Sequence, residues 1–367
     1  MQVSRSAATE FRGRVFAVLV LLLAGIVSIE QASAAEPSGP RVLLIHDMEG
    51  LSGQNDPYTF LYGHPAYPKG QALLIADVNA VIAGLFAGGA ASVVVADGHG
   101  SGNPGPDILV DQLDKRASLV SRDQPFDAYL DLAEQGAFDA VAVVGMHCKS
   151  GSGGFAAHTY TIGMKLLVNG HSITETELVG LLYGRAGIPV IFASGDDRLA
   201  ADLKTMPWLQ YVTTKKAKSA ADAELYPVAQ VHEAMRKQAK LAVQRLKSAT
   251  VMKPEGPLQI AVRAVPPANM RWLKVMPGVN YQDETVSFVA TDMADAYRRM
   301  RPIVTALSFS FSDAELTAFK AQPNASDLEF KGMEELYRRW FAAESGEAAT
   351  VAAPTAPAAK TQYHGFH

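Results

Sequence analysis

The chain has 367 residues, a formal net charge of −4 and a single cysteine, Cys148. Positive and negative residues are mixed along the chain, which excludes a basic stripe for nucleic acid, and a lone cysteine excludes an internal disulfide framework. A chain of this length can bury one large core or two modest ones.

The first 34 residues have the pattern of a secretory signal peptide. Arg5, Arg12 and Arg14 form a basic segment, residues 15–29 are apolar, and residues 32–34 are the small residues Ala-Ser-Ala. The apolar run is shorter than the roughly 20 residues of a spanning helix, so cleavage is favoured over an uncleaved membrane anchor. We therefore expect an exported protein, periplasmic or secreted, that has no membrane contact after signal cleavage.

Short apolar runs then alternate with helical patterns. Residues 70–89 have helical periodicity and end on glycines. The expected buried strands are residues 41–46, 92–97, 140–145 and 188–194. This alternation predicts an α/β fold with a largely parallel central sheet and helices on both faces.

The second half predicts further elements. Residues 157–170 resemble an inserted hairpin, followed by a helix that starts near Ile173 and by a long polar helix at residues 228–246. Strands at residues 258–264 and 284–292 and a helix at residues 293–307 form a C-terminal α+β part. We expect one main domain over residues 35–310, a helical extension over 311–342 and a disordered Ala/Pro-rich tail over 343–367.

Two carboxylates follow the first strand. Asp47 and Glu49 are separated by one residue, so in an extended chain both side chains point to the same face. Burial of such a pair is costly unless a cation offsets the charge.

Histidines follow two more strands. His99 comes after residues 92–97, and His147 comes after residues 140–145. Sites of open α/β sheets form at the carboxyl ends of the strands, so these side chains and the two carboxylates predict a metal site there. The alternative for each histidine is an ordinary structural hydrogen bond. Asp97 either orients the imidazole of His99 or simply ends the strand.

A further ligand and a catalytic residue are less well defined by the sequence. Ser172 with Glu175 and Thr174 with Glu177 both have capping-box spacing. Only one pair can cap the helix, and the other glutamate is then available for the site. His158 follows a glycine-rich loop and is either a core histidine or a catalytic base.

Other polar residues near the strand ends favour structural roles. Asp196 follows a strand and could cap the next helix. Lys149, Arg185 and Arg198 could hold a substrate carboxylate, but surface salt links are the favoured interpretation.

The combined set of side chains suits zinc. Three carboxylates and two histidines are mixed oxygen and nitrogen ligands, and five are too many for one open catalytic zinc. They fit two ions about 3.5–4 Å apart with one bridging carboxylate. The implied reaction is metal-assisted hydrolysis of an amide or ester.

Several motifs together resemble the DppA-type D-aminopeptidases, a family of dinuclear zinc peptidases. They are DMEGLSG from Asp47, DGHG from Asp97, GMH with AAH eleven residues further on, GDDR from Gly195, and VMPGVNY followed by VSFVATDMADAY. The resemblance is collinear over residues 41–307.

The resemblance implies a specific assignment of roles. Asp47 would bridge two Zn²⁺ ions, and His158 would act on the nucleophile. Glu49 with His99 would complete one zinc site, and His147 with Glu175 the other. It further implies release of N-terminal D-amino acids from short peptides, and a ring-shaped homo-oligomer.

The chain departs from the family pattern at Ile45, where a serine is usual, at Glu177, where a small residue is commoner, and in its two terminal extensions. We expect an exported zinc-dependent aminopeptidase acting on short peptides. The alternatives are another metal-dependent amidase or esterase at the same site, and a periplasmic solute-binding protein, which would show two similar lobes.

Overall fold

The computed structural model describes residues 38–120, 127–266, 268–275, 279–308 and 324–346. The expected signal peptide, the first part of the expected extension and residues 347–367 lie outside these ranges.

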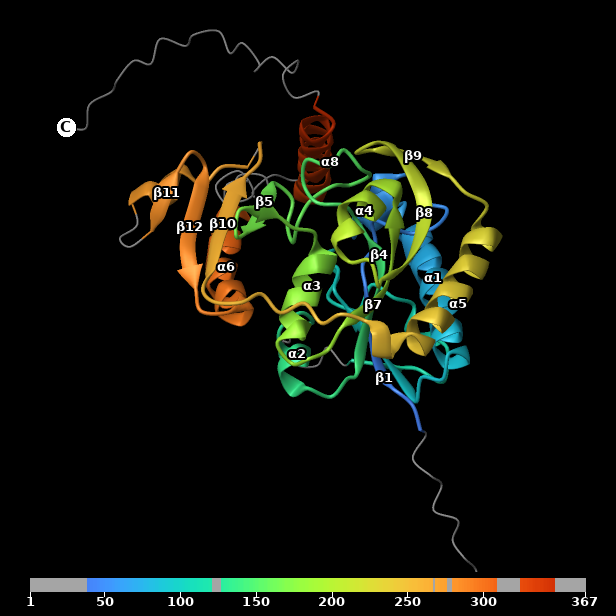
Figure 1. The fold of residues 1–367 in the computed structure, drawn as a ribbon. Helices are drawn as coiled ribbons and strands as arrows, with labels where there is room; N and C mark the ends of the chain where they lie inside the picture. The colour runs from blue at the N-terminus through green and yellow to red at the C-terminus, as the bar shows by residue number, and fades with distance from the viewer. Residues whose placement is uncertain (1–37, 121–126, 267, 276–278, 309–323, 347–367) are drawn as a thin grey trace, which may run out of the picture. The chain divides into compact units, whose positions relative to one another are not determined.

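The central sheet has seven strands in the order β3-β2-β1-β4-β7-β8-β9 (Figure 1). All neighbouring strands are parallel except β8 and β9, which are antiparallel. The strands are β1 Arg41–His46, β2 Ser92–Asp97, β3 Ser118–Leu119, β4 Ala140–Met146, β7 Val190–Asp196, β8 Gln210–Ser219 and β9 Asp222–Leu225. The predicted α/β class and largely parallel sheet are therefore confirmed.

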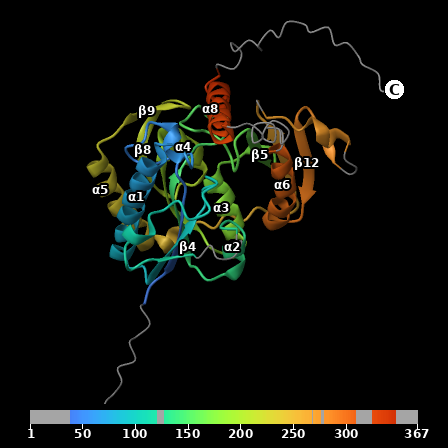
Figure 2. The same cartoon turned by 180° about the vertical axis from the view of Figure 1, so that it is seen from behind.

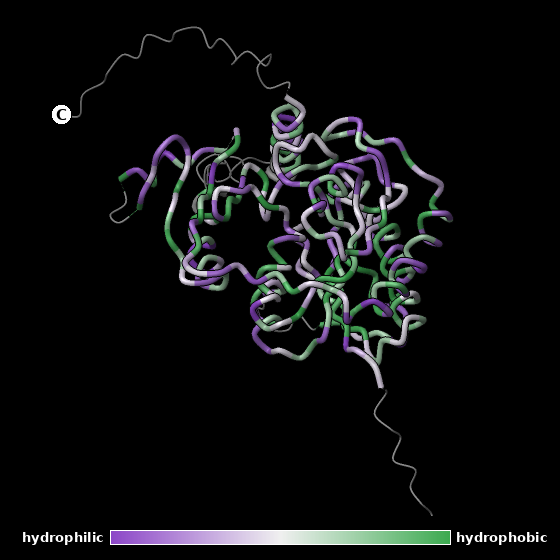
Figure 3. Tube along the Cα trace, in the orientation of Figure 1, coloured by the Kyte–Doolittle hydropathy of each residue, from purple (hydrophilic) through white to green (hydrophobic). Residues whose placement is uncertain are grey.

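Helices cover both faces of this sheet. α1 (Tyr67–Ala87) and α5 (Val228–Gln244) pack on one face, and α2 (Asp131–Gln135) and α3 (Glu175–Gly184) pack on the other (Figures 1 and 2). Alternate residues of β1 point to the two faces, which gives two apolar clusters, one on each side of the sheet. The central strands are correspondingly apolar along their length (Figure 3).

Among the described residues, α1 is the one helix long and apolar enough to cross a membrane, but 56% of its most apolar window is buried inside the protein. Its apolar side chains contribute to the core beneath α5. This helix is therefore explained by packing against the sheet.

A second sheet is antiparallel and has the order β11-β12-β10-β5-β6. Its strands are β5 Met164–Val168, β6 His171–Ser172, β10 Leu258–Ala264, β11 Asn280–Gln282 and β12 Thr285–Ala290. The predicted hairpin and the predicted C-terminal part thus form one sheet, because β5 pairs with β10.

The hairpin lies further along the chain than predicted. Its turn is at Asn169–Gly170, both with positive φ, and it joins β5 to β6. Residues 157–163 form no strand of the hairpin, although Thr159 and Thr161 make an isolated bridge.

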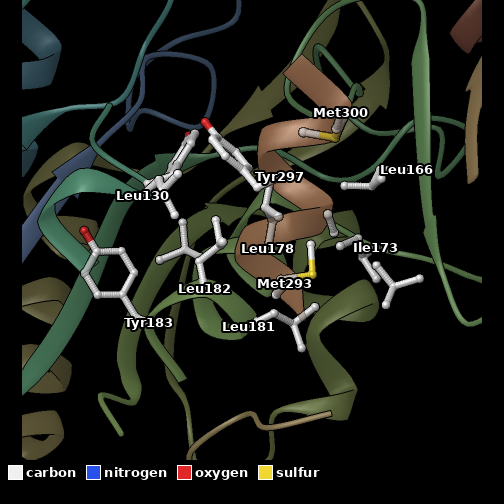
Figure 4. Close-up of a cluster of buried hydrophobic side chains, with 14 of the residues drawn as sticks. Leu130, Leu166, Ile173, Leu178, Leu181, Leu182, Tyr183, Met293, Tyr297 and Met300 are labelled. Atoms are coloured by element: carbon white, nitrogen blue, oxygen red, sulfur yellow. The ribbon is translucent and has the colours of Figure 1, made fainter. Parts of the chain in front are cut away.

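α6 (Met293–Ser308) joins the second sheet to the rest of the protein. Its residues Met293, Tyr297 and Met300 lie in one buried cluster with Leu178 and Leu182 of α3 (Figure 4). This cluster also includes residues of β5 and β10, so α6 is packed against α3 and against the second sheet.

The remaining elements are short, apart from the last helix. α4 spans Asp197–Asp202, and α8 spans Ala325–Glu344. α8 lies within the predicted extension and continues two residues into the predicted tail. Short 3-10 segments are η1 Pro57–Phe60, η2 Val110–Gln112, η3 Leu203–Thr205, η4 Leu246–Ser248 and η5 Arg271–Val275.

Candidate metal centre

The five predicted ligands meet at the carboxyl end of the central strands. Strands β2, β1 and β4 are neighbours in the sheet, and Glu175 is the first residue of α3. Asp47 and Glu49 follow β1, His99 follows β2 and His147 follows β4. At most 8% of any of these side chains is exposed.

The side chains form two groups. In each group of three residues, one possible ligand atom per residue lies within 4.8 Å of the other two. The first group is Asp47, Glu49 and His99, and the second is His147, His158 and Glu175. The Asp47 Oδ2 atom lies 3.4 Å from His147 Nε2, so Asp47 contacts both groups. This position fits the bridging role that the family resemblance implies.

Two glycines allow the ends of β1 and β4 to approach. A Cβ atom on Gly50 would lie 2.0 Å from the carbonyl oxygen of Met146, and one on Gly145 would lie 2.3 Å from that of Asp47. The Gly50 amide donates to the Gly145 carbonyl at 2.7 Å. Close contact of the two backbones brings the carboxylates of the first loop beside His147.

The start of α3 shows which glutamate caps the helix. Thr174 is the N-cap, its Oγ1 atom accepts from the Glu177 amide, and Glu177 Oε2 accepts from the Thr174 amide. Glu175 is therefore free to point into the site, where its Oε1 atom lies 3.1 Å from His147 Nε2. The Tyr129 hydroxyl donates to Glu175 Oε2 at 2.8 Å and holds the carboxylate in place.

Each imidazole uses its Nδ1 atom for a structural contact. His99 Nδ1 is 2.8 Å from Asp107 Oδ2, His147 Nδ1 is 3.1 Å from the Cys148 carbonyl, and His158 Nδ1 is 2.8 Å from the Ala156 carbonyl. All three partners are acceptors, so in the neutral ring the hydrogen belongs on Nδ1 and the lone pair on Nε2. In each case Nε2 is on the carboxylate side of the ring, as a metal ligand or proton acceptor requires.

The carboxylate that contacts the His99 ring is Asp107, while Asp97 ends β2, which is the second of the two interpretations of that residue. Asp97 accepts from the backbone amides of His99 and Asp107, at 3.0 and 2.7 Å. It therefore shapes the loop, and Asp107 contacts the ring. Sequence reasoning missed Asp107 because it lies ten residues past the strand end.

His158 lies directly on His147. The two rings are stacked with centroids 3.7 Å apart and an interplanar angle of 12°, and His158 Nε2 is 3.8 Å from Glu175 Oε1. Burial and the neighbouring His147 lower the pKa of His158 to about 4. The ring is therefore neutral near pH 7, with an unprotonated Nε2 facing the site.

The carboxylates dominate the electrostatics of the other two histidines. Burial opposes the charged form of His147, but Glu175 and Asp47 outweigh it and hold the pKa well above its usual range. His99 behaves in the same way because of Glu49 and Asp107. Burial also opposes ionisation of Glu49, yet His99 lowers the pKa of Glu49 to about 2. The centre therefore stabilises positive charge.

The donor set fits zinc. Three carboxylates and two imidazoles supply oxygen and nitrogen ligands, and the buried Nε2 atom of His147 makes no hydrogen bond of acceptable geometry. A nitrogen oriented in this way among carboxylates is suited to a cation.

A buried lysine and a buried aspartate support the first loop, and sequence reasoning missed both. Lys215 of β8 donates to the Glu49 carbonyl at 2.6 Å and to Gln54 Oε1 at 2.7 Å. Asp77 of α1 accepts from the Ser52 amide at 2.8 Å. Burial lowers the pKa of Lys215 to about 7. The signal for Lys215 was weak because β8 contains Thr and Lys residues where the other parallel strands are apolar.

The basic residues considered as carboxylate holders form salt links. Lys149 pairs with Asp202 at 3.4 Å, Arg185 pairs with Asp292 at 3.3 Å, and Arg198 pairs with its neighbour Asp197 at 3.9 Å. Asp196 caps α4 by accepting from the Arg198 and Leu199 amides. The structural interpretation of these residues is confirmed.

Comparison with known proteins agrees with the geometry of this centre. Residues 41–302 match the peptidase M55 family, described as D-aminopeptidase. A D-aminopeptidase of Bacillus subtilis (strain 168) is 28% identical over 261 residues, which cover 69% of this chain and 93% of the relative.

A solved structure has the same fold. It is described as the Zn-dependent D-aminopeptidase DppA from Bacillus subtilis, a self-compartmentalizing protease, with a TM-score of 0.66 and 23% identity. The similarity covers 75% of this chain and 99% of that structure. With most of the chain matched by the family and the predicted ligands gathered at one sheet edge, the protein belongs to the peptidase M55 family of D-aminopeptidases.

Proposed function

We propose that the protein is an exported, zinc-dependent aminopeptidase that hydrolyses short peptides with a D-amino acid at the N-terminus. The observation that carries the proposal is the convergence of five ligand-type side chains and His158 at the carboxyl edge of the sheet. Family membership and the D-aminopeptidase relative support the reaction class.

Two zinc ions per chain are part of the proposal. Asp47 would bridge them, Glu49 and His99 would complete one site, and His147 and Glu175 would complete the other. Bound zinc would act as a Lewis acid on the scissile carbonyl and favour ionisation of the attacking water.

In this proposal one residue transfers the proton, and others hold the metal-binding side chains in place. His158 Nε2 has its lone pair toward the site, so this atom can accept the proton from water and later deliver it to the leaving amine. Tyr129 keeps the Glu175 carboxylate oriented, and Asp107 keeps His99 oriented. Burial of the centre excludes most solvent and strengthens these interactions.

The test is hydrolysis of D-Ala-D-Ala and L-Ala-L-Ala by the zinc-loaded mature chain, with and without a chelator. Cleavage of the D-peptide alone, abolished by the chelator, would support the metal, the reaction and the stereochemistry. Cleavage of the L-peptide would refute the specificity. Cleavage of neither would refute the peptidase proposal in favour of another amidase or esterase.

The proposal extends to location and assembly. Export is supported by the basic, apolar and small-residue segments of residues 1–34. N-terminal sequencing of the protein from a periplasmic or secreted fraction should begin near Ala35. A ring-shaped homo-oligomer is supported by the self-compartmentalizing DppA structure, and light scattering should show a multiple of the chain mass.

A further inference from the structure

α8 lies outside the region that matches the family, yet it contacts the loop that carries His158. The family match ends at residue 302, and α8 spans Ala325–Glu344. Trp340 of α8 is 1% exposed, and its ring meets that of His158 edge to face, with centroids 5.2 Å apart and an interplanar angle of 87°. The Trp340 Nε1–H group donates to the Ala157 carbonyl at 3.2 Å.

The loop that carries His158 has an unfavourable backbone conformation. Ala156 and Tyr160 flank His158 with φ values of 51° and 68°, a region that residues with a Cβ atom rarely adopt. Such a conformation persists only where surrounding contacts hold it. The loop therefore depends on its neighbours for the orientation of the His158 ring.

The end of α8 holds the same loop region at other points. Glu344 accepts from the Ser150 hydroxyl at 2.5 Å and from the Gly151 amide at 2.6 Å. The Ala220 amide donates to Ser345 Oγ at 3.3 Å, and the Ala220 carbonyl accepts from the Ala156 amide at 2.8 Å. α8 and the residue after it thus contact the loop before His158 directly and through Ala220.

Aromatic contacts also lead from α8 toward the other group of ligands. The rings of Tyr337 and Trp340 are 5.6 Å apart, and Tyr337 is 5.9 Å from Phe60. Phe60 in turn meets the edge of His99 at 6.3 Å. The Tyr337–Trp340 and Phe60–His99 contacts are edge to face, a preferred arrangement of aromatic rings, and the Tyr337–Phe60 contact is tilted at 38°.

We propose that Trp340 of α8 is a positioning residue, which holds His158 in its productive orientation through the ring contact and the hydrogen bond to Ala157. The catalytic consequence rests on the proposed function of His158. The positioning itself is a property of the folded chain and can be measured separately.

The experiment compares Trp340→Leu and Trp340→Phe with Phe341→Leu in the zinc-loaded full chain. Trp340→Phe keeps an aromatic edge but loses the donor. Phe341 is a matched control because it is 6% exposed and its ring centroid lies 4.8 Å from that of Trp340. Among the described residues, its ring pairs with Tyr337 and Trp340 and not with His158. The measurements are zinc content, kcat and KM on D-Ala-D-Ala, and hydrogen–deuterium exchange of the segment 156–161.

We expect Trp340→Leu to retain zinc and KM within about twofold, while kcat falls at least about tenfold, because a misplacement of about 1 Å can cost about 100-fold in rate. Exchange of residues 156–161 should increase. Trp340→Phe should be intermediate, and it replaces Trp340→Leu if that variant does not fold. Phe341→Leu should lower the melting temperature and leave kcat and loop exchange near wild type.

Two results would overturn the inference. One is unchanged loop exchange in both Trp340 variants, and the other is an equal increase in Phe341→Leu, which would show general loosening of α8. An inactive zinc-loaded wild type would refute the proposed function instead, and the exchange data would still decide the positioning role.

Discussion

At the scale of single residues, the two nitrogens of each imidazole in the centre have different partners. In His99, His147 and His158 the Nδ1 atom has a structural acceptor, and Nε2 is left for chemistry. A histidine held in this way has one tautomer and one ring orientation, which suits both ligation and proton transfer. The three residues differ in what Nε2 faces, and this difference separates the expected effects of their substitution.

His147→Ala should remove zinc and activity together. His147 Nε2 lies within 3.4 Å of both Asp47 and Glu175, so its loss leaves two buried carboxylates without their shared partner. We expect kcat/KM to fall about 1,000-fold, equivalent to about 4 kcal/mol. Zinc per chain by emission spectrometry and peptide hydrolysis check this, with the exposed His171→Ala as control. Full zinc content and turnover would contradict the ligand assignment.

His158→Ala should separate zinc binding from turnover. If His158 acts on protons, the variant keeps its zinc and loses about 10²–10⁴-fold in kcat. The same two measurements decide this. Loss of zinc would instead make His158 a ligand, a role that its proximity to Glu175 allows.

Asp107→Asn should weaken zinc binding through His99. Asp107 accepts from His99 Nδ1 with one oxygen and from the Ser101 and Tyr67 hydroxyls with the other. An Asn amide could still offer one oxygen to Nδ1, but it carries no charge, and its NH2 group would then face two hydroxyls that donate. We expect zinc affinity at the His99 group to fall about 10–100-fold, measured by competition with a chelating dye. The exposed Asp111→Asn is the control. Equal affinities of the two variants would argue against orientation by Asp107.

At the scale of elements, the centre depends on close backbone contact between the segments that end β1 and β4. The Asp47 amide donates to the Val144 carbonyl at 2.8 Å, and Gly50 and Gly145 leave no space for a side chain. The two groups of predicted ligands are brought together by this contact and by the cap of α3, which leaves Glu175 free to point into the site. Backbone packing therefore determines the distance between the groups.

Gly50→Ala should separate these segments. The new Cβ atom would lie 2.0 Å from the Met146 carbonyl oxygen, so the backbone must move. We expect a loss of about 1–3 kcal/mol in the free energy of unfolding, together with reduced zinc binding. Gly105→Ala is a matched control because its Cβ would make only an ordinary contact of 3.7 Å. Chemical denaturation with the metal assay tests this, and wild-type behaviour of Gly50→Ala would refute it.

At the scale of the whole molecule, the centre lies where several distant parts of the chain meet. The segments after strands β1, β2 and β4 and the first residue of helix α3 all supply side chains. A cation bound there joins these elements in the folded state only. Zinc should therefore stabilise the fold as well as support the reaction.

Saturating zinc should raise the melting temperature of the full chain, and a chelator should reverse the rise. At a free concentration about 100 times Kd, one site contributes about 2.7 kcal/mol. Differential scanning calorimetry with and without zinc measures the effect, and His147→Ala should show a smaller rise. An identical melting temperature with and without zinc would show that the metal does not bind the folded chain selectively.

Much of the sheet is predictable because its strands carry local signals. Residues 41–46 and 92–97 are strands β1 and β2 with the predicted bounds, since each is a short apolar run with a polar residue at either end. β8 was not predicted because Thr and Lys interrupt its apolar pattern, and its pairing with β7 is what buries Lys215. The hairpin begins at β5, later than predicted, because β5 pairs with β10, about 90 residues further along the chain.

The sequence by itself determined the fold class and the type of site, because apolar runs define the strands and the rule for parallel sheets places Asp47, Glu49, His99 and His147 at one edge. Only the tertiary structure decided which partners act on these side chains. Lys215 and Trp340 reach the centre through packing between segments separated by 166 and 183 residues, and Asp107 reaches it through the shape of the loop after β2. Local sequence patterns do not predict such contacts, because the contacts depend on how the folded elements pack together.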